Sequence, residues 1–451
     1  RARPHRAHLA RRARRPPVTA APAAGTSPVG EERHASWLEL FFDLVVVAGI
    51  GMLAHLLQED HDGGGLALYV VAYTAFWLVW ACFTTYGNVA GEGARSLPIL
   101  AGMAALAVMI AAVPGIHDEH ARAFAVAYVV GRLVAARPWR RTTVVVDLPV
   151  VQALAGVVPW IVSWWTDGQT RYVLWGVGLA IDLLLLLTLS GERLVRRAQE
   201  RLDEVRERRG RGRALGGRRA RPGAPDRGRR RDLEVPTTVD AAASDVPHLG
   251  ERLGLFVIIV LGEGLIQAID AASEAEWDRT LLVAGAGAFT LLVGLWALTV
   301  RSGYAGVALL RPAGVPPRVA WFLHLVTTGA LATLAGALGG VLDRPARALE
   351  PAELALLVGA FAVHGLASAG VHAVLRDVRT ALVLAVPVVA AGTVAALAGG
   401  SASAAGLVWV LSGALLVQLS GAVRARRVAP TAPSGPTAAG TAAEADARDD
   451  A

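Results

Sequence analysis

The chain has 451 residues, of which 54% are apolar and 18% are charged, and its mean hydropathy is +0.46. An average soluble domain carries about 25% charged residues. Long apolar runs alternate with short polar gaps from Ser36 to Ala422, which excludes an ordinary soluble enzyme, a disordered chain and a fibrous protein. The sequence therefore predicts an all-α polytopic membrane protein.

Residues 1–35 are rich in Arg, Ala and Pro and predict a disordered basic arm. Twelve apolar segments follow, each close to the length of about 20 residues that a transmembrane helix needs. The predicted membrane helices lie near residues 38–57, 66–87, 97–114, 121–136, 143–165, 171–190, 252–271, 280–300, 318–342, 352–375, 379–399 and 404–422.

The gaps between these segments alternate in charge. The first, third and seventh gaps are acidic, whereas the fourth, sixth, eighth and tenth are basic. Because cytoplasmic loops carry the excess of basic residues, both termini are predicted on the cytoplasmic side of a bacterial inner membrane. The predicted organisation is one six-helix repeat over 36–190, a linker over 191–250, a second six-helix repeat over 251–423 and a disordered tail over 424–451.

The linker is the most basic part of the chain. Between Gly191 and Arg231 there are 16 arginines and six acidic residues, so we expect contact with anionic lipid headgroups. Nucleic acid is not expected as a partner, because no aromatic residue interleaves these arginines. Cys82 is the sole cysteine and lies in an apolar run, so neither a disulfide within the chain nor a metal or other cofactor is expected.

The two halves of the chain resemble each other in sequence. The Phe-Ala-Val of residues 124–126 recurs at 361–363, and the Leu-Pro-Val-Val of 148–151 resembles the Val-Pro-Val-Val of 386–389. Since six helices are an even number, both halves enter the membrane from the same side. The sequence therefore predicts a parallel repeat, with a pseudo-twofold axis along the membrane normal.

The opening helix begins with Trp-Leu-Glu-Leu-Phe-Phe-Asp, in which Glu39 and Asp43 are four residues apart and share one helix face. Two neighbouring carboxylates in a low dielectric favour a bound proton or cation. The structural alternative is that Glu39 caps the helix N-terminus or pairs with a nearby arginine such as Arg33.

A second carboxylate, Glu263, lies about twelve residues into the seventh predicted helix, between Gly262 and Gly264. Near the middle of the bilayer a carboxylate costs several kcal/mol unless it is paired, protonated or hydrated. The flanking glycines allow another backbone, an ion or water to approach. The alternative is a protonated Glu263 that hydrogen-bonds across helices. At the start of the same helix, Glu251 and Arg252 predict an interfacial ion pair.

Further polar residues fall within the apolar segments. Arg132 is expected to neutralise Asp147 or another core carboxylate, and Asp182 is expected to be buried against a partner. His324, His364 and His372 suit either a proton relay or satisfied hydrogen bonds in the core, while their scattered spacing does not favour a metal site. The residues expected to support an ion site are Arg132, Asp147, His324 and His364.

With these motifs in view, residues 34–423 resemble the bacterial low temperature requirement A (LtrA) family. The stretch from Glu39 to Asp43 looks like the opening helix of that family, and the stretch from Glu251 to Glu263 looks like its mid-chain signature. His324 also resembles a His-Leu position of the family. The region after Trp80 keeps little of the family's acidic pattern. The resemblance implies a multi-pass architecture and a link to growth in the cold, and it implies no particular substrate.

Three functions remain open at this stage. The first is a transporter or channel for protons, cations or a small solute, with Glu39, Asp43 and Glu263 as binding carboxylates. The second is a membrane sensor or scaffold, in which the linker binds lipid or a partner. The third, an enzyme acting on lipid, is disfavoured because the sequence has no nucleophile motif and no metal cluster, so an enzyme is not expected.

Overall fold

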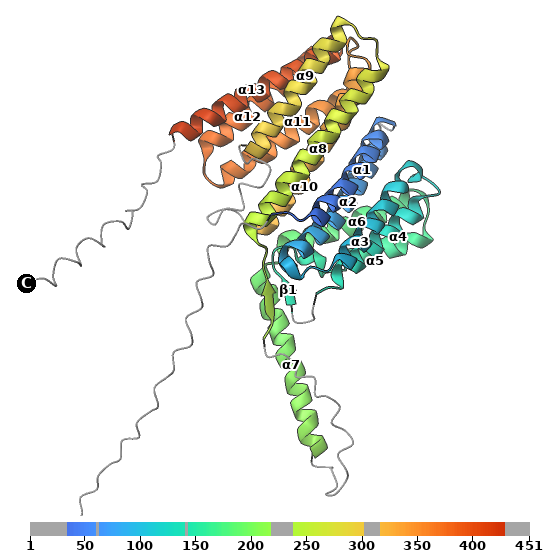
Figure 1. Cartoon of the computed structure of the whole chain (residues 1–451), viewed down its shortest axis with the longest axis vertical. Coiled ribbons are helices and arrows are strands. Elements are labelled where there is room, and N and C mark those ends of the chain that lie inside the picture. Colours follow the sequence, from blue (N-terminus) through green and yellow to red (C-terminus); the bar gives the residue numbers. More distant parts are fainter. Residues whose placement is uncertain (1–33, 60–62, 140–142, 218–237, 302–315, 429–451) are drawn as a thin grey trace, which may run out of the picture. The chain divides into compact units, whose positions relative to one another are not determined.

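The structure is a computed structural model, and it describes residues 34–59, 63–139, 143–217, 238–301 and 316–428. These residues are almost entirely helical (Figure 1). In the first half the α-helices are α1 (Trp37–Glu59), α2 (Gly63–Ala90), α3 (Ser96–Ala111), α4 (Ala121–Ala136), α5 (Val157–Val162) and α6 (Gly168–Thr188). They are followed by α7 (Gly191–Gly217), α8 (Val246–Glu274), α9 (Arg279–Trp296), α10 (Pro317–Asp343), α11 (Pro351–Val374), α12 (Val378–Ala398) and α13 (Ala404–Val428).

Nine of the helices in the described ranges are long and apolar enough to cross a membrane, namely α1, α2, α6 and α8 to α13. Helix α3 is apolar but shorter, and α4 has the same length of 16 residues. At 1.5 Å per residue, such a helix spans about 24 Å of a hydrocarbon core that is about 30 Å thick. The prediction of a multi-pass helical membrane protein is confirmed.

The prediction of one continuous helix over 143–165 is wrong. This segment consists of the strand β1 (Thr143–Val145), the 3-10 turns Pro149–Val151 and Ser163–Trp165, and the short α5. A run of β-branched residues and two prolines, Pro149 and Pro159, interrupt the helical hydrogen bonds here. The side chain of Gln152 instead accepts from the backbone N–H of Val145 (3.0 Å) and donates to the carbonyl of Thr143 (2.7 Å).

The linker contains one long helix, α7, that packs near the strand pair of β1 with β2 (Asp240–Ala242). The two strands are parallel, with Thr143 opposite Asp240. The start of the fifth segment is thereby tied to the residues that precede α8. The predicted arm and tail lie largely outside the described residues, although α13 continues to Val428, inside the range predicted as tail.

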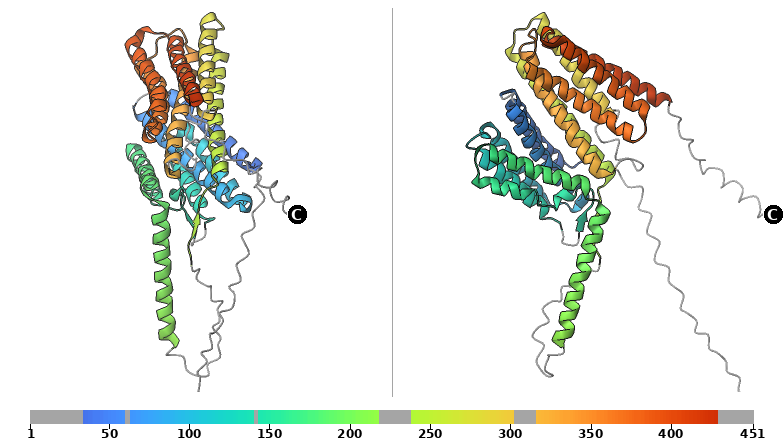
Figure 2. Two further views of the ribbon diagram at one scale, coloured as in Figure 1. Left: turned by 90° about the vertical axis from the view of Figure 1, so that its left-hand side faces the viewer. Right: turned by 180° about the vertical axis from the view of Figure 1, so that it is seen from behind.

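The two halves meet mainly along α1, α2, α8 and α10, and α6 of the first half also packs against α10. Helices α1 and α2 of the first half pack against α8 and α10 of the second half, and α8 packs closely on α10. Figures 1 and 2 show α8 (yellow-green) and α10 (orange) with the blue α1 and α2 beside them. The largest buried side chains at this junction are Trp77, Trp80 and Trp321. The polar residues described below lie in the same junction.

Candidate functional site

The first polar cluster lies where α1 and α8 begin. Asp43 is completely buried, and its Oδ1 accepts hydrogen bonds from Arg252 Nη2 (2.6 Å) and from the indole N–H of Trp80 (2.8 Å). Arg252 is 1% exposed, so this ion pair is shielded from solvent on both sides. The prediction that Arg252 pairs with Glu251 is wrong, because Glu251 instead lies 3.6 Å from the exposed His34.

Glu39 caps the start of α1. Its Oε2 accepts from the backbone N–H of Ser36 (2.8 Å), and the Ser36 hydroxyl accepts from the backbone N–H of Glu39 (3.3 Å), which is the reciprocal pattern of a capping box. The same oxygen lies 3.6 Å from Nε2 of the buried His248 on α8. Glu39 is therefore held by its own helix and by the second half of the chain, and Arg33 lies outside the described residues.

His248 connects this cluster to α2. The side-chain amide of Asn88 lies 3.0 Å from His248 Nδ1 and also donates to the carbonyl of Asp245 (3.0 Å), while its oxygen accepts from the Asp245 N–H (2.8 Å). Asp245 is the N-cap of α8 and accepts from the His248 N–H. The starts of α1 and α8 and the end of α2 are thus joined by buried hydrogen bonds.

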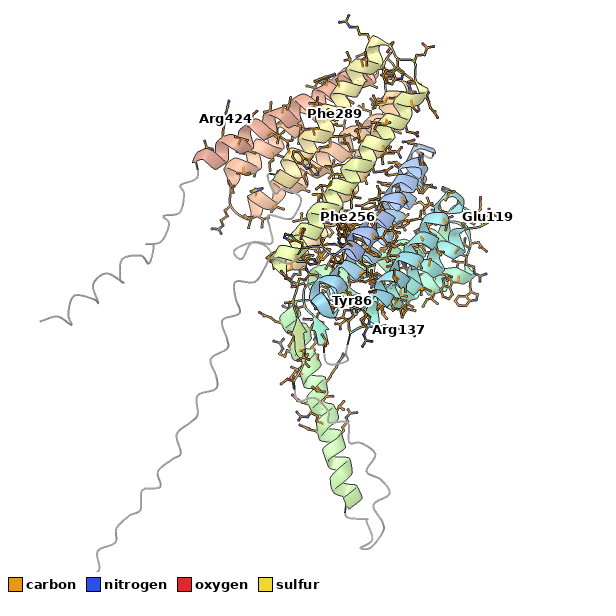
Figure 3. The ribbon with its side chains drawn as sticks, viewed as in Figure 1. Tyr86, Glu119, Arg137, Phe256, Phe289 and Arg424 are labelled. Atoms are coloured by element: carbon orange, nitrogen blue, oxygen red, sulfur yellow. The ribbon has the colours of Figure 1, made fainter. Side chains whose placement is uncertain are left out.

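An aromatic layer separates this cluster from the rest of the junction. The Trp80 ring stacks on His324 with the ring centroids 5.5 Å apart, and its centroid lies 4.2 Å from that of Phe256, which Figure 3 labels on α8. Trp77 and Trp321 complete the layer with edge contacts. These bulky side chains fill the space between α2, α8 and α10.

His324 has a defined protonation state in this layer. The indole N–H of Trp77 donates to His324 Nδ1 (3.0 Å), and His324 Nε2 lies 3.1 Å from the carbonyl oxygen of Leu253. Because an indole only donates and a carbonyl only accepts, the ring is neutral and carries its proton on Nε2. Both nitrogens of His324 are therefore used in holding α2, α8 and α10 together.

Glu263 lies in a different environment. It is 5% exposed, and its Oε1 accepts a hydrogen bond from the side-chain amide of Gln267 (2.9 Å), one turn further along α8. A Cβ atom added to Gly51 of α1 would lie 2.8 Å from the same oxygen, so the carboxylate rests directly on the α1 backbone. Within the described ranges, no arginine or histidine forms an ion pair with Glu263.

Asp43 and Glu263 belong to separate levels of the membrane. Asp43 pairs with Arg252, whereas Glu263 touches Gly51. Gly51 lies eight residues after Asp43 on α1, and Glu263 lies eleven residues after Arg252 on α8. The rise of an α-helix converts these intervals into about 12 Å along α1 and about 16 Å along α8. The two carboxylates therefore cannot bind one ion together.

The other predicted residues lie apart from the junction. Arg132 pairs with the core carboxylate Asp182 rather than with Asp147, which accepts from the Ser244 N–H near the linker. His364 Nε2 lies 3.4 Å from the Thr299 hydroxyl.

Each of the three histidines contacts a different polar partner. His372 Nδ1 lies 3.4 Å from Asp377, His364 lies beside Thr299, and His324 lies in the aromatic layer. No group of three metal-binding side chains occurs among the residues that the structure describes.

Arg132 explains how an interrupted segment is tolerated inside the first half. Besides the ion pair with Asp182, it donates to the hydroxyl of Tyr128 (2.9 Å) and to the carbonyls of Val150 (2.8 Å) and Ala153 (3.2 Å). Free carbonyls in a membrane are costly unless other groups of the protein donate hydrogen bonds to them. Arg132 therefore compensates the carbonyls that the break between β1 and α5 leaves without helical partners.

Sequence reasoning missed several members of the junction. Arg252, His248 and Asn88 lie at predicted helix ends, where a polar residue is normally in contact with water or headgroups. Gln58 and Gln267 carry no charge, so neither residue stands out from the apolar helix in which it lies. The spacing of Glu263 and Gln267, four residues apart on one helix, was the one signal available.

The model of a family described as bacterial low temperature requirement A protein (LtrA) matches residues 34–418. The chain belongs to the LtrA family. The matched range includes all of α1, α2, α8 and α10. The buried clusters of the junction therefore lie within the part of the chain that matches the LtrA family. No curated protein and no solved structure matches it significantly.

Proposed function

We propose that this LtrA family protein moves a proton or a small cation across the membrane, with Glu263 as the carboxylate that binds it. The observation that carries the proposal is a difference among the buried acids. Asp43 pairs with Arg252 and Asp182 pairs with Arg132, whereas Glu263 has a neutral amide as its partner within the described part of the chain.

An ionised carboxylate without a cationic partner is unfavourable inside a membrane protein by several kcal/mol. A bound proton or a small cation removes this cost, and its release restores it. Glu263 can therefore bind and release a cation without disturbing an ion pair on which the packing depends. Because Gly51 of α1 has no side chain, it leaves room for the carboxylate of Glu263 between α1 and α8.

Asp43 supports the same function in another way. Its ion pair with Arg252 joins the first half of the chain to the second, as do the contacts of Glu39 and Asn88 with His248. In this conformation these bonds hold the starts of α1 and α8 together. We assign Asp43 to closure of this end of the junction and Glu263 to binding.

The topology that this function needs is a parallel repeat of two six-segment halves with both termini in the cytoplasm. In its support, the helix pairs that pack in the first half recur in the second. The pairs α1–α3, α3–α4, α2–α6, α4–α5 and α5–α6 correspond to α8–α10, α10–α11, α9–α13, α11–α12 and α12–α13. The interrupted segment 143–165 takes the place of α12.

The interrupted segment is proposed as a full crossing. Its start pairs with β2 beside the linker, while α6, which follows its end, is bonded to the connection between α3 and α4, because the Tyr172 hydroxyl donates to the carbonyl of His117 (2.8 Å). Counting it, the chain crosses twelve times, in the inner membrane of a bacterium. The basic linker then lies in the cytoplasm, where anionic lipid headgroups are its proposed partner.

The test is ion flux into sealed liposomes that contain the purified protein, followed by a pH-sensitive dye under potassium and sodium gradients. Wild type is compared with Glu263→Gln, which keeps the shape and hydrogen bonding of the side chain but removes the charge. Flux that is present in wild type and absent in a folded Glu263→Gln variant supports the proposal. Equal flux in both proteins would contradict it, and no flux in either would favour a sensor, a scaffold or an enzyme acting on lipid.

A further inference from the structure

We propose that Glu263 exchanges its proton or cation with the side of the membrane at which α1 ends, through a polar route formed by Gln267 and Gln58. This inference rests on the proposed function, because it concerns access to the same carboxylate. It adds the side of the membrane from which the proton or cation reaches Glu263, and it assigns positioning roles to Gln267 and Gln58.

The route is a chain of amides that connects three helices. Gln267 Nε2 donates to Glu263 Oε1 (2.9 Å), and Gln58 Nε2 on α1 donates in turn to Gln267 Oε1 (3.3 Å). Gln58 also donates to the carbonyl of Gly336 on α10 (3.0 Å). The sequence of polar groups thus leads from Glu263 toward the last turn of α1, where Gln58 is followed by the end of the helix.

Glycines make space for this chain of amides. A Cβ atom at Gly339 would lie 2.8 Å from Gln58 Nε2, a distance at which one of the two groups must move. Gly285 on α9 does not line the route, and nothing lies within 4 Å of the corresponding Cβ position. A methyl group at Gly339 would therefore meet the route, whereas one at Gly285 would not.

A small pocket continues the route outward from Gln58. It has a volume of about 30 Å³ and is lined by the ends of α1 and α10 and the start of α11, including Gln58, Gly340 and Glu353. A cavity of this size accommodates a water molecule where polar groups are present. Glu353 is fixed at its edge, because Arg347 donates to both of its carboxylate oxygens (2.6 and 2.9 Å) and the Glu350 N–H donates to Oε2 (2.8 Å).

The opposite direction is closed. Between Glu263 and the start of α8 lie the aromatic layer around Trp80 and His324 and then the Asp43–Arg252 pair. His324 uses both ring nitrogens within the protein, and no continuous set of hydrogen bonds among the described residues links it to Glu263. The side chains that pack against Gly264, the next residue of α8, are the apolar Leu292 of α9 and Ala335 of α10.

The experiment measures which side controls Glu263, independently of net transport. In sealed liposomes, protein orientation is read from trypsin cleavage of the Arg-rich linker, and the pH inside and outside is set separately. Dicyclohexylcarbodiimide enters from the lipid and reacts with protonated carboxyl groups, and mass spectrometry quantifies its attachment to Glu263. We expect the modification to follow the pH on the side opposite to the linker.

The variants test the route itself. Gln58→Leu and Gly339→Ala should slow the response of the labelling to a pH jump on that side by about five- to tenfold, because each disturbs a hydrogen bond of the chain of amides. Gly285→Ala on α9 is the control and should behave like wild type, because it adds a methyl group in a membrane helix away from the route. Thermal unfolding of each variant shows that it remains folded.

The outcomes separate this inference from the proposed function. Labelling that follows the linker side, that follows both sides equally, that does not occur at any pH, or that is unchanged by Gly339→Ala, would overturn the route. If such a result accompanies flux that depends on Glu263, the proposed function stands and the route fails. If labelling is sided as expected but no ion moves, the route stands as access to a binding site and the proposed transport fails.

Discussion

Asp182 in the first half and Glu263 in the second are both buried carboxylates of membrane helices, but their surroundings differ. Asp182 is completely buried beside Arg132 and Tyr128, and Arg132 in turn donates to the carbonyls of an irregular backbone segment. Glu263 is bonded to one neutral amide, that of Gln267. The charge of Asp182 is compensated within the protein, whereas Glu263 has no cationic partner among the described residues and is the acid that we propose binds an ion.

The largest effect is expected from breaking the compensated pair. Arg132→Leu leaves Asp182 buried without its counter-charge and removes donors from the carbonyls of Val150 and Ala153. Breaking a buried ion pair from one side costs about 3–5 kcal/mol of folding free energy. The measurement is thermal or denaturant unfolding in detergent micelles. The double variant Arg132→Leu/Asp182→Leu should recover part of this loss, and an equally unstable double variant would mean that the carbonyls, rather than the pair, dominate.

Glu263→Gln tests the acid that has no cationic partner among the described residues. Because Gln267 can donate to the amide oxygen of a glutamine as it does to the carboxylate, we expect a change in unfolding free energy within about 1 kcal/mol. A loss as large as that of Arg132→Leu would show that Glu263 is also a structural residue, and the contrast drawn between the two acids would then be wrong.

Breaking the pair at the start of α1 and α8 should have an intermediate effect. Asp43→Asn removes the charge that faces Arg252 but keeps an oxygen for the indole of Trp80. Hydrogen bonds to charged groups contribute about 1.5–3 kcal/mol, and the carboxylate of Glu39 remains nearby to attract Arg252. Unfolding measurements test the size of the loss. If the pair also closes this end of the junction, the carbodiimide labelling of Glu263 in Asp43→Asn should begin to respond to the linker-side pH.

Sequence reasoning predicted those parts of the fold that depend on composition. The apolar segments, the burial of Glu263 and Asp43 and the membership of a membrane family all follow from residues that are neighbours in the chain. The partner of each charge does not. Whether Arg132 pairs with Asp147 or Asp182 depends on how α4 and α6 pack. Likewise, the composition of residues 143–165 predicts an apolar helix, because the sequence does not show that Arg132 donates to the carbonyls of this segment.

A smaller effect is expected in the aromatic layer. Trp77→Phe removes the donor to His324 Nδ1 while keeping an aromatic ring, and one hydrogen bond contributes about 0.5–1.5 kcal/mol. In wild type, ¹⁵N NMR of labelled histidine should identify His324 as a neutral ring protonated on Nε2. The variant should shift the Nδ1 resonance, because that nitrogen no longer accepts a hydrogen bond. Detection of a charged His324 ring in wild type would contradict the assignment.

A small effect is also expected outside the membrane helices, where water solvates charged side chains. Asp377 is the N-cap of α12, and the N–H of Thr380 donates to its carboxylate (3.1 Å). Hydrogen bonds from the side chain and the backbone N–H of Thr380, together with the nearby His372, hold the pKa of Asp377 below its usual range. Asp377→Ala should cost about 1 kcal/mol, as the loss of an N-cap typically does.

Since the pKa of Asp377 is lowered in the folded state, the contribution of its ionised form to stability is present at neutral pH and is lost as the pH falls through the carboxyl range. The difference in unfolding temperature between wild type and Asp377→Asn should therefore shrink on acidification. A difference that grows instead would mean that the neutral carboxyl group stabilises α12 better than the ionised one.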